Sequence, residues 1–128
     1  MPTYFPVSFE AATLEPMTDL DAKVSFRHVG RLIVLDLDGP LAGQRVTEEL
    51  RNHVRELLEA GTRHFAINLL EVPYVDSAGV GALIASRLAI RAAGGKLTLL
   101  SAHPRILDTL KRLRVDSFFE FSDNQAAA

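Results

Sequence analysis

The sequence predicts an α/β domain whose mixed, mostly parallel sheet has four or five strands, is opened by an antiparallel hairpin and is packed with helices. Three observations lead to this fold class. Two apolar, strand-like runs near the beginning are separated by a break at Gly30. Helix-like and strand-like segments then alternate, which is typical of right-handed crossovers in a parallel sheet. The length of 128 residues suits one domain with one substantial core.

Composition and charge narrow the classes of function. Hydrophobic residues make up 48% of the chain and charged residues 23%, as in folded globular domains. The net charge of −2 offers no basic excess for nucleic-acid binding. The chain has no cysteine, which excludes disulfides, zinc–thiolate sites and a cysteine nucleophile. Its apolar runs are too short to span a membrane and its first residues lack a signal-peptide pattern, so we expect a cytoplasmic protein without membrane insertion.

The first half of the domain predicts a hairpin and a helix. Residues 24–29 alternate in polarity, and residues 31–37 form an apolar run that ends at Asp38-Gly39-Pro40. A helix is best defined over residues 47–60, where Val46, Leu50, Val54, Leu57 and Leu58 share one face. Glu48 and Glu49 suit the positive end of that helix. Gly61 is a suitable residue to follow it.

The second half repeats the strand and helix alternation. Residues 64–70 and 96–100 are apolar strands, and residues 77–93 read as a helix that Gly94-Gly95 stops. Pro104 opens a third helix at a favoured position. Residues 118–121 supply a last short strand.

The two ends of the chain differ from the domain between them. Residues 1–22 form an N-terminal extension, either an arm or an extra strand, since Phe5, Val7 and Phe9 alternate. The domain covers residues 23–122, and residues 123–128 form a flexible tail. Exposure of Phe5 and Phe9 would favour a homodimer.

Functional groups are expected beyond the carboxyl ends of the parallel strands. This rule selects residues 36–40, 71–81 and 101–104. The second segment is the most informative, because Asp76-Ser77 begins a helix that carries Gly79 and Gly81 in its first turns.

Two interpretations of this helix start remain open. Asp76 or Ser77 can cap the helix, but capping explains only one of the two polar residues. Each interior glycine costs up to about 1 kcal/mol relative to alanine. The small residues leave a flat helix start that another backbone could approach closely. A hydroxyl on such a surface, once phosphorylated, would gain about −1.5 to −2 charges and could switch binding.

The segment Tyr74-Val75-Asp76-Ser77-Ala78-Gly79-Val80-Gly81 resembles the signature of STAS domains, the sulphate-transporter and anti-sigma-factor-antagonist family. Asn68-Leu69 supplies the expected strand ending, and the Gly94-Gly95 stop with its following strand and short helix also matches. The resemblance covers residues 24–121 and implies a STAS-like fold.

The resemblance implies an anti-sigma factor antagonist that is not an enzyme and needs no cofactor. The unphosphorylated form would bind an anti-sigma factor that is also a serine kinase. Phosphorylation at Ser77 would switch binding off, and a phosphatase would restore it. The implied partner-binding residues are Asn68, Tyr74, Asp76, Ser77, Ala78, Gly79, Val80 and Gly81.

One departure from the family favours an alternative partner. Many anti-sigma factor antagonists carry two acidic residues after the second strand, where this chain has Gly39-Pro40-Leu41-Ala42. The alternative is a STAS subunit that is not phosphorylated, in a lipid-transporting ABC assembly or a stress-signalling complex.

An enzyme is the alternative from another class. Residues 32–40 resemble the first motif of haloacid-dehalogenase phosphatases, in which Asp36 would attack phosphorus and Asp38 would act as acid and base. The short chain, Pro40 after the second Asp and the hairpin topology argue against it. The histidines show no metal-ligand spacing, so no metal site is expected; they are His28, His53, His64 and His103.

Overall fold

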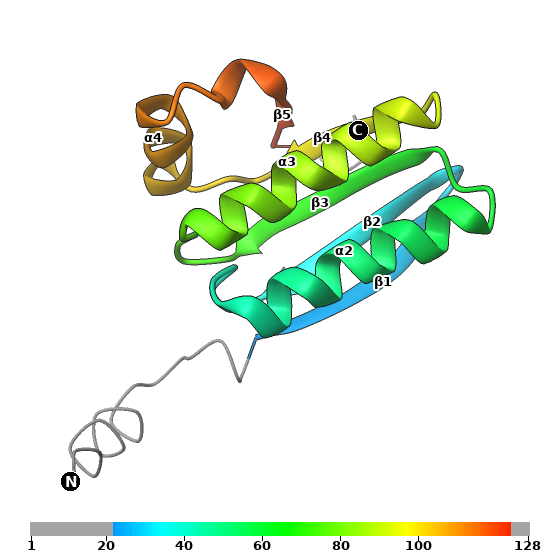
Figure 1. Cartoon of the computed structure of the whole chain (residues 1–128), viewed down its shortest axis with the longest axis horizontal. Coiled ribbons are helices and arrows are strands. Elements are labelled where there is room, and N and C mark those ends of the chain that lie inside the picture. The colour runs from blue at the N-terminus through cyan, green and yellow to red at the C-terminus, as the bar shows by residue number, and fades with distance from the viewer. Residues whose placement is uncertain (1–21, 124–128) are drawn as a thin grey trace, which may run out of the picture.

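A computed structural model describes residues 22–123, which form one five-stranded sheet with helices (Figure 1). The strands lie in the order in which they occur in the chain, β1-β2-β3-β4-β5. Their bounds are Lys23–Val29 for β1, Leu32–Asp38 for β2, His64–Glu71 for β3, Lys96–Leu100 for β4 and Glu120–Ser122 for β5. The pair β1–β2 is antiparallel and the later pairs are parallel, which confirms the predicted mixed sheet.

The opening hairpin follows from local chemistry. Gly30 adopts a positive φ of 62° between the two strands, a conformation that glycine enters without steric cost. The antiparallel register then pairs Val29 with Leu32 and Phe26 with Leu35. Because side chains alternate along a strand, this register directs Leu35 and Leu37 to one face and Val34 and Asp36 to the other.

Helices α2 (Gln44–Glu59) and α3 (Ser77–Ala92) run side by side along the same face of the sheet (Figure 1). Right-handed crossovers between strands that follow one another in order place successive helices on a single face. Helix α4 (Pro104–Arg112) and the short 3-10 helix η1 (Asp116–Phe118) connect β4 to β5. The loops that precede α2 and α3 therefore lie at the same edge of the sheet.

The main core lies between the sheet and the helices. Its largest fully buried side chains come from every layer, and examples are Leu35, Leu50, Phe65, Leu83 and Ile106. A smaller cluster of Val34, Ala66 and Leu100 lies on the opposite face. The sheet face on which a strand residue's side chain lies thus decides which of the two clusters it joins.

The structure corrects the bounds of two predicted elements. The last strand, predicted over residues 118–121, is β5 at Glu120–Ser122, because Asp116–Phe118 form the 3-10 helix η1 before it. Helix α2 begins at Gln44, earlier than residue 47, because Gly43 with φ of 82° forms its N-cap. Glu48 and Glu49 therefore lie beyond the first turn, whereas the sequence placed them at the positive helix end. The predictions for the N-terminal extension and for most of the tail fall on residues 1–21 and 124–128, outside the described part of the chain.

Candidate functional site

The candidate site is built by two loops that follow parallel neighbours β2 and β3. The Leu41 N–H donates to the Tyr74 carbonyl at 3.1 Å, and the Asp76 N–H donates to the Leu41 carbonyl at 3.4 Å. Leu41 and Val75 form an isolated parallel bridge and are both buried. This bridge continues the sheet pairing for one step beyond the strands and joins the two loops.

Asp76 links the starts of helices α2 and α3. One carboxylate oxygen accepts the Gly79 N–H at 2.8 Å, which is the usual N-cap bond of α3. The other oxygen accepts the Gly43 N–H at 3.0 Å, at the N-cap of α2. A single side chain thereby satisfies donors at two helix ends, which sets the relative position of the two helix starts.

Gly79 allows the β2–α2 loop to pack against α3. A Cβ at this position would collide with the backbone carbonyl of Leu41. The close approach that the sequence suggested is therefore made by the chain's own backbone. Gly81 differs, because a Cβ there would lie 3.5 Å from Nη2 of Arg51, an ordinary contact with a flexible side chain.

Ser77 is the first residue of α3 and is exposed. Within residues 22–123 its hydroxyl makes no hydrogen bond to another residue. The N-terminus of a 16-residue helix favours negative charge, whereas the neighbouring Asp76 carboxylate opposes it. Arg51 brings a guanidinium across from α2 to the first turns of α3. The Ser77 hydroxyl is thus accessible at a helix start, where the helix end favours added negative charge and Asp76 opposes it.

The other residues predicted to bind a partner are not all on one surface. Tyr74 and Ala78 are exposed beside Ser77, and Gly81 is half-buried. Gly79 and Val80 are buried, so they support the surface from beneath. Asn68 lies in β3 on the sheet face opposite α3, because its neighbour in register is Asp36.

Asp36 belongs to a separate polar group on that opposite face. The Arg27 guanidinium donates to both carboxylate oxygens, at 2.7 and 3.3 Å, and the Asn68 amide donates at 2.8 Å. Partial burial raises the pKa of Asp36, but these hydrogen bonds and the Arg27 charge outweigh it and hold the pKa below its usual range. Asp36 is engaged structurally, which does not suit the nucleophile of a phosphatase.

No metal-binding group of three or more acidic, histidine or cysteine side chains occurs among residues 22–123. In the same part of the chain, no helix has both the length and the apolar character needed to cross a bilayer.

The sequence interpretation missed two residues of the site. Gly43 presents its N–H to Asp76, and Arg51 lies over Gly81. A glycine directly before an amphipathic helix was an available signal for the first, since glycine is among the favoured N-cap residues. Nothing in the sequence singled out Arg51 among the exposed charges of α2, because its role depends on the packing of α2 beside α3.

The chain is thus an α/β domain with α2 and α3 on one face of a mixed sheet, and Ser77 stands at the start of its second crossover helix. The family model described as the STAS domain matches residues 23–128. The chain belongs to the STAS domain family.

Solved structures share this fold. SpoIIAA, an anti-sigma factor antagonist, in its unphosphorylated form is 20% identical, with a TM-score of 0.70 over 82% of this chain and 92% of that one. An anti-sigma factor antagonist from Mycobacterium paratuberculosis is 14% identical, with a TM-score of 0.71 over 87% and 93%. A sulfate transporter family protein from Wolinella succinogenes is 18% identical, with a TM-score of 0.69 over 88% and 89%. No curated protein matches the chain significantly.

Proposed function

We propose that this chain is an anti-sigma factor antagonist that acts in the cytoplasm and is switched by phosphorylation at Ser77. The unphosphorylated form binds an anti-sigma factor that is also a serine kinase, and a phosphatase reverses the modification. The observation that carries the proposal is the exposed Ser77 hydroxyl at the start of α3, next to the loops that Asp76 joins. ATP and Mg²⁺ would belong to the kinase, so this chain is a substrate and ligand.

The partner surface in this proposal surrounds Ser77. Tyr74 and Ala78 supply exposed contact area, while Gly79 lets the helix start pack against the β2–α2 loop and Val80 is buried beneath the surface. A phosphoserine would add about −1.5 to −2 charges to a formal net charge of −2, concentrated at this surface. A partner that must desolvate Ser77 on docking would lose affinity once that charge is present.

The test is phosphorylation and binding with the anti-sigma kinase of the same organism. Incubation with the kinase and MgATP is expected to add one phosphate, located on Ser77 by peptide mass spectrometry. Ser77→Ala should accept none, whereas Ser117→Ala, another exposed serine, should be modified normally. Ser77→Asp should weaken kinase binding in calorimetry. An unmodified Ser77 together with binding that Ser77→Asp leaves unchanged would refute the proposal.

A second candidate function is a STAS subunit of a transport or stress-signalling complex that is not phosphorylated. The loop after β2 favours it, because Pro40 and Ala42 are buried and apolar where many antagonists carry acids. Capture of partners from a lysate of the source organism separates the two candidates. Recovery of a transporter ATPase in place of an anti-sigma kinase would favour the second.

A further inference from the structure

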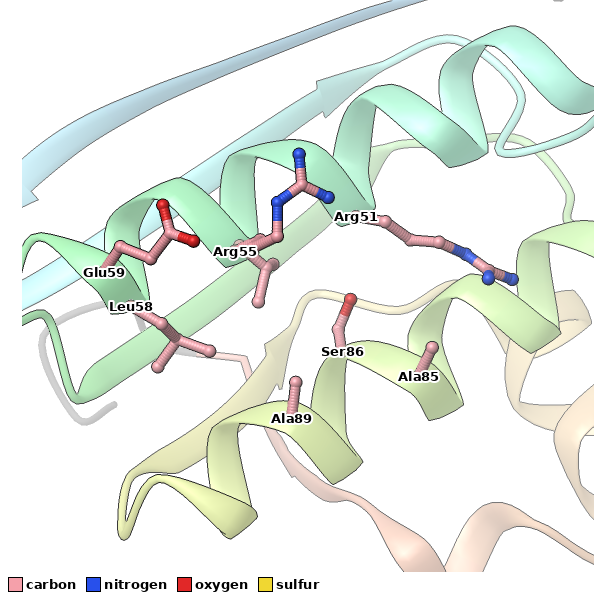
Figure 2. Close-up of a pocket in the computed structure, with 8 residues that line it drawn as sticks. Arg51, Arg55, Leu58, Glu59, Ala85, Ser86 and Ala89 are labelled. Carbon is pink, nitrogen blue, oxygen red and sulfur yellow. The ribbon is translucent and has the colours of Figure 1, made fainter.

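A groove with a volume of about 300 Å³ runs between α2 and α3 (Figure 2). Its lining residues come from these two helices alone: Arg51, Val54, Arg55, Leu58, Glu59, Ala85, Ser86 and Ala89. The groove exists because α3 presents small side chains where it faces α2. Ala85, Ser86 and Ala89 point toward α2 and leave the space between the helices unfilled (Figure 2).

The floor of the groove is apolar. Val54 is buried and Leu58 is half-buried at its base. The one hydroxyl in the floor, that of Ser86, donates to the Ala82 carbonyl at 2.8 Å. The Ser86 hydroxyl therefore already has an acceptor within α3. A ligand on the floor needs no polar group to satisfy it. An aliphatic chain suits this part of the groove.

Charge is distributed unevenly along the wall that α2 provides. Arg51, Arg55 and Glu59 follow one another at intervals of one helical turn, so Arg51 lies at one end, Arg55 in the middle and Glu59 at the other end. In the part of the chain that the structure describes, neither arginine makes a hydrogen bond or an ion pair. Figure 2 shows Arg51 reaching across toward α3, over Gly81. The groove thus combines an apolar floor with a cationic end.

We propose that this groove binds a free medium-chain fatty acid as its carboxylate. The alkyl chain lies along Val54, Leu58 and Ala89, and the carboxylate receives charge-assisted hydrogen bonds from Arg51, the arginine that reaches across toward α3 (Figure 2). Glu59 repels the carboxylate from the other end and so fixes the orientation. The volume is at the lower end of the range of ligand pockets, which limits the length of the chain.

The extent of the apolar surface favours a small ligand over a protein partner. A stable protein interface covers roughly 800 Å² on each partner. None of the large exposed hydrophobic side chains of the described residues lines the groove; they are Phe26, Leu70, Tyr74, Leu88, Leu113, Phe118 and Phe121. The accessible apolar surface of the groove is therefore small, and charged side chains of α2 border it. Such a surface suits a small amphiphilic ligand.

Calorimetry with decanoate and decanol, both below their aggregation concentrations, tests the charge requirement. Decanoate should bind saturably and at least about tenfold more tightly than decanol, since only the carboxylate can accept charge-assisted hydrogen bonds from Arg51. Arg51→Gln should remove this preference, whereas Arg105→Gln on the exposed surface of α4 should keep it. Failure of decanoate to bind, or equal affinity for decanol, overturns the proposal without needing any variant.

Amide chemical shifts and a filling variant test the location. Decanoate should shift the amides of Leu58, Ala85 and Ala89 most strongly. Ala89→Leu should weaken binding at least about tenfold by occupying the groove, whereas Ala92→Leu, an equal enlargement outside it, should not. Circular dichroism of both variants verifies folding. Shifts confined to other surfaces, or unchanged binding by a folded Ala89→Leu protein, contradict the assignment. Neither result bears on phosphorylation of Ser77.

Discussion

The carbonyl oxygen of Leu41 lies directly against the α-carbon of Gly79, where no side chain could be accommodated. This contact packs the loop after β2 onto the first turn of α3. Both residues are buried, and the Asp76 N–H donates to the same Leu41 carbonyl. The position of Ser77 therefore depends on a backbone contact between segments that are far apart in the sequence.

Gly79→Ala should destabilise the domain by at least about 2 kcal/mol, because the new Cβ meets backbone that cannot move aside easily. The matched control is Gly81→Ala, where only the flexible Arg51 side chain is near. That control should stabilise the protein by up to about 1 kcal/mol, since alanine is the better helix former. Urea unfolding measures both free energies. Equal effects of the two substitutions would contradict the assigned roles.

Asp76→Ala should lower the free energy of unfolding by about 1–2 kcal/mol, because α3 loses its N-cap. Asp76→Asn should cost less, since its amide oxygen can still accept the Gly79 N–H. Chemical denaturation of the two variants provides the comparison. In amide hydrogen exchange, Gly43 should exchange faster in Asp76→Ala than in the parent. Unchanged exchange at Gly43 would show that the link between helix starts is dispensable.

Ser77→Ala should change the free energy of unfolding by no more than about 0.5 kcal/mol. The hydroxyl is exposed and bonds to no other residue within the described range, so its loss removes no contact. Thermal and urea unfolding test this expectation. A loss well above that value would mean that Ser77 stabilises the helix start, and binding effects of the variant could not then be attributed to the missing hydroxyl alone.

Asp36→Asn should destabilise the protein by about 0.5–1 kcal/mol at pH 7, and the difference should shrink in acid. Partial burial opposes the charged form, but the Arg27 and Asn68 bonds lower the pKa of Asp36 in the folded protein. The charged carboxylate therefore adds stability above its ordinary pKa of about 3.9, and this stability is lost as the pH falls through the lower folded pKa.

Urea unfolding of Asp36→Asn and the parent at pH 7 and below pH 4 measures this dependence. Asp108→Asn serves as the control, because its pair with Arg112 at 3.4 Å is far more exposed than the pair of Asp36 with Arg27. The control should change stability little at either pH. A difference between Asp36→Asn and the parent that persists undiminished in acid would contradict the assigned ion pair.

Local pattern predicted most of the fold because each element carries its own signals. Apolar runs marked β2 to β4, and glycines at 30, 61 and 94 adopt positive φ at the turns where the sequence has its breaks. Helix α2 was placed too late, since its N-cap at Gly43 is held by Asp76, 33 residues away. Gly43 itself was a local signal for the helix start, but its bond to Asp76 spans too many residues to be visible in a local window of sequence.

The sequence by itself determined the order of strands and helices and put Asp76 and Ser77 at a helix start, because periodicity, turn residues and capping act over a few neighbours. Tertiary structure decided which side chains share a surface. Side chains alternate along β3, so the Asn68 side chain lies on the face opposite α3, although β3 leads directly into the loop that begins α3. The packing of α2 beside α3 brings Arg51 over Gly81 and opens the groove, since distances between helices depend on every layer beneath them.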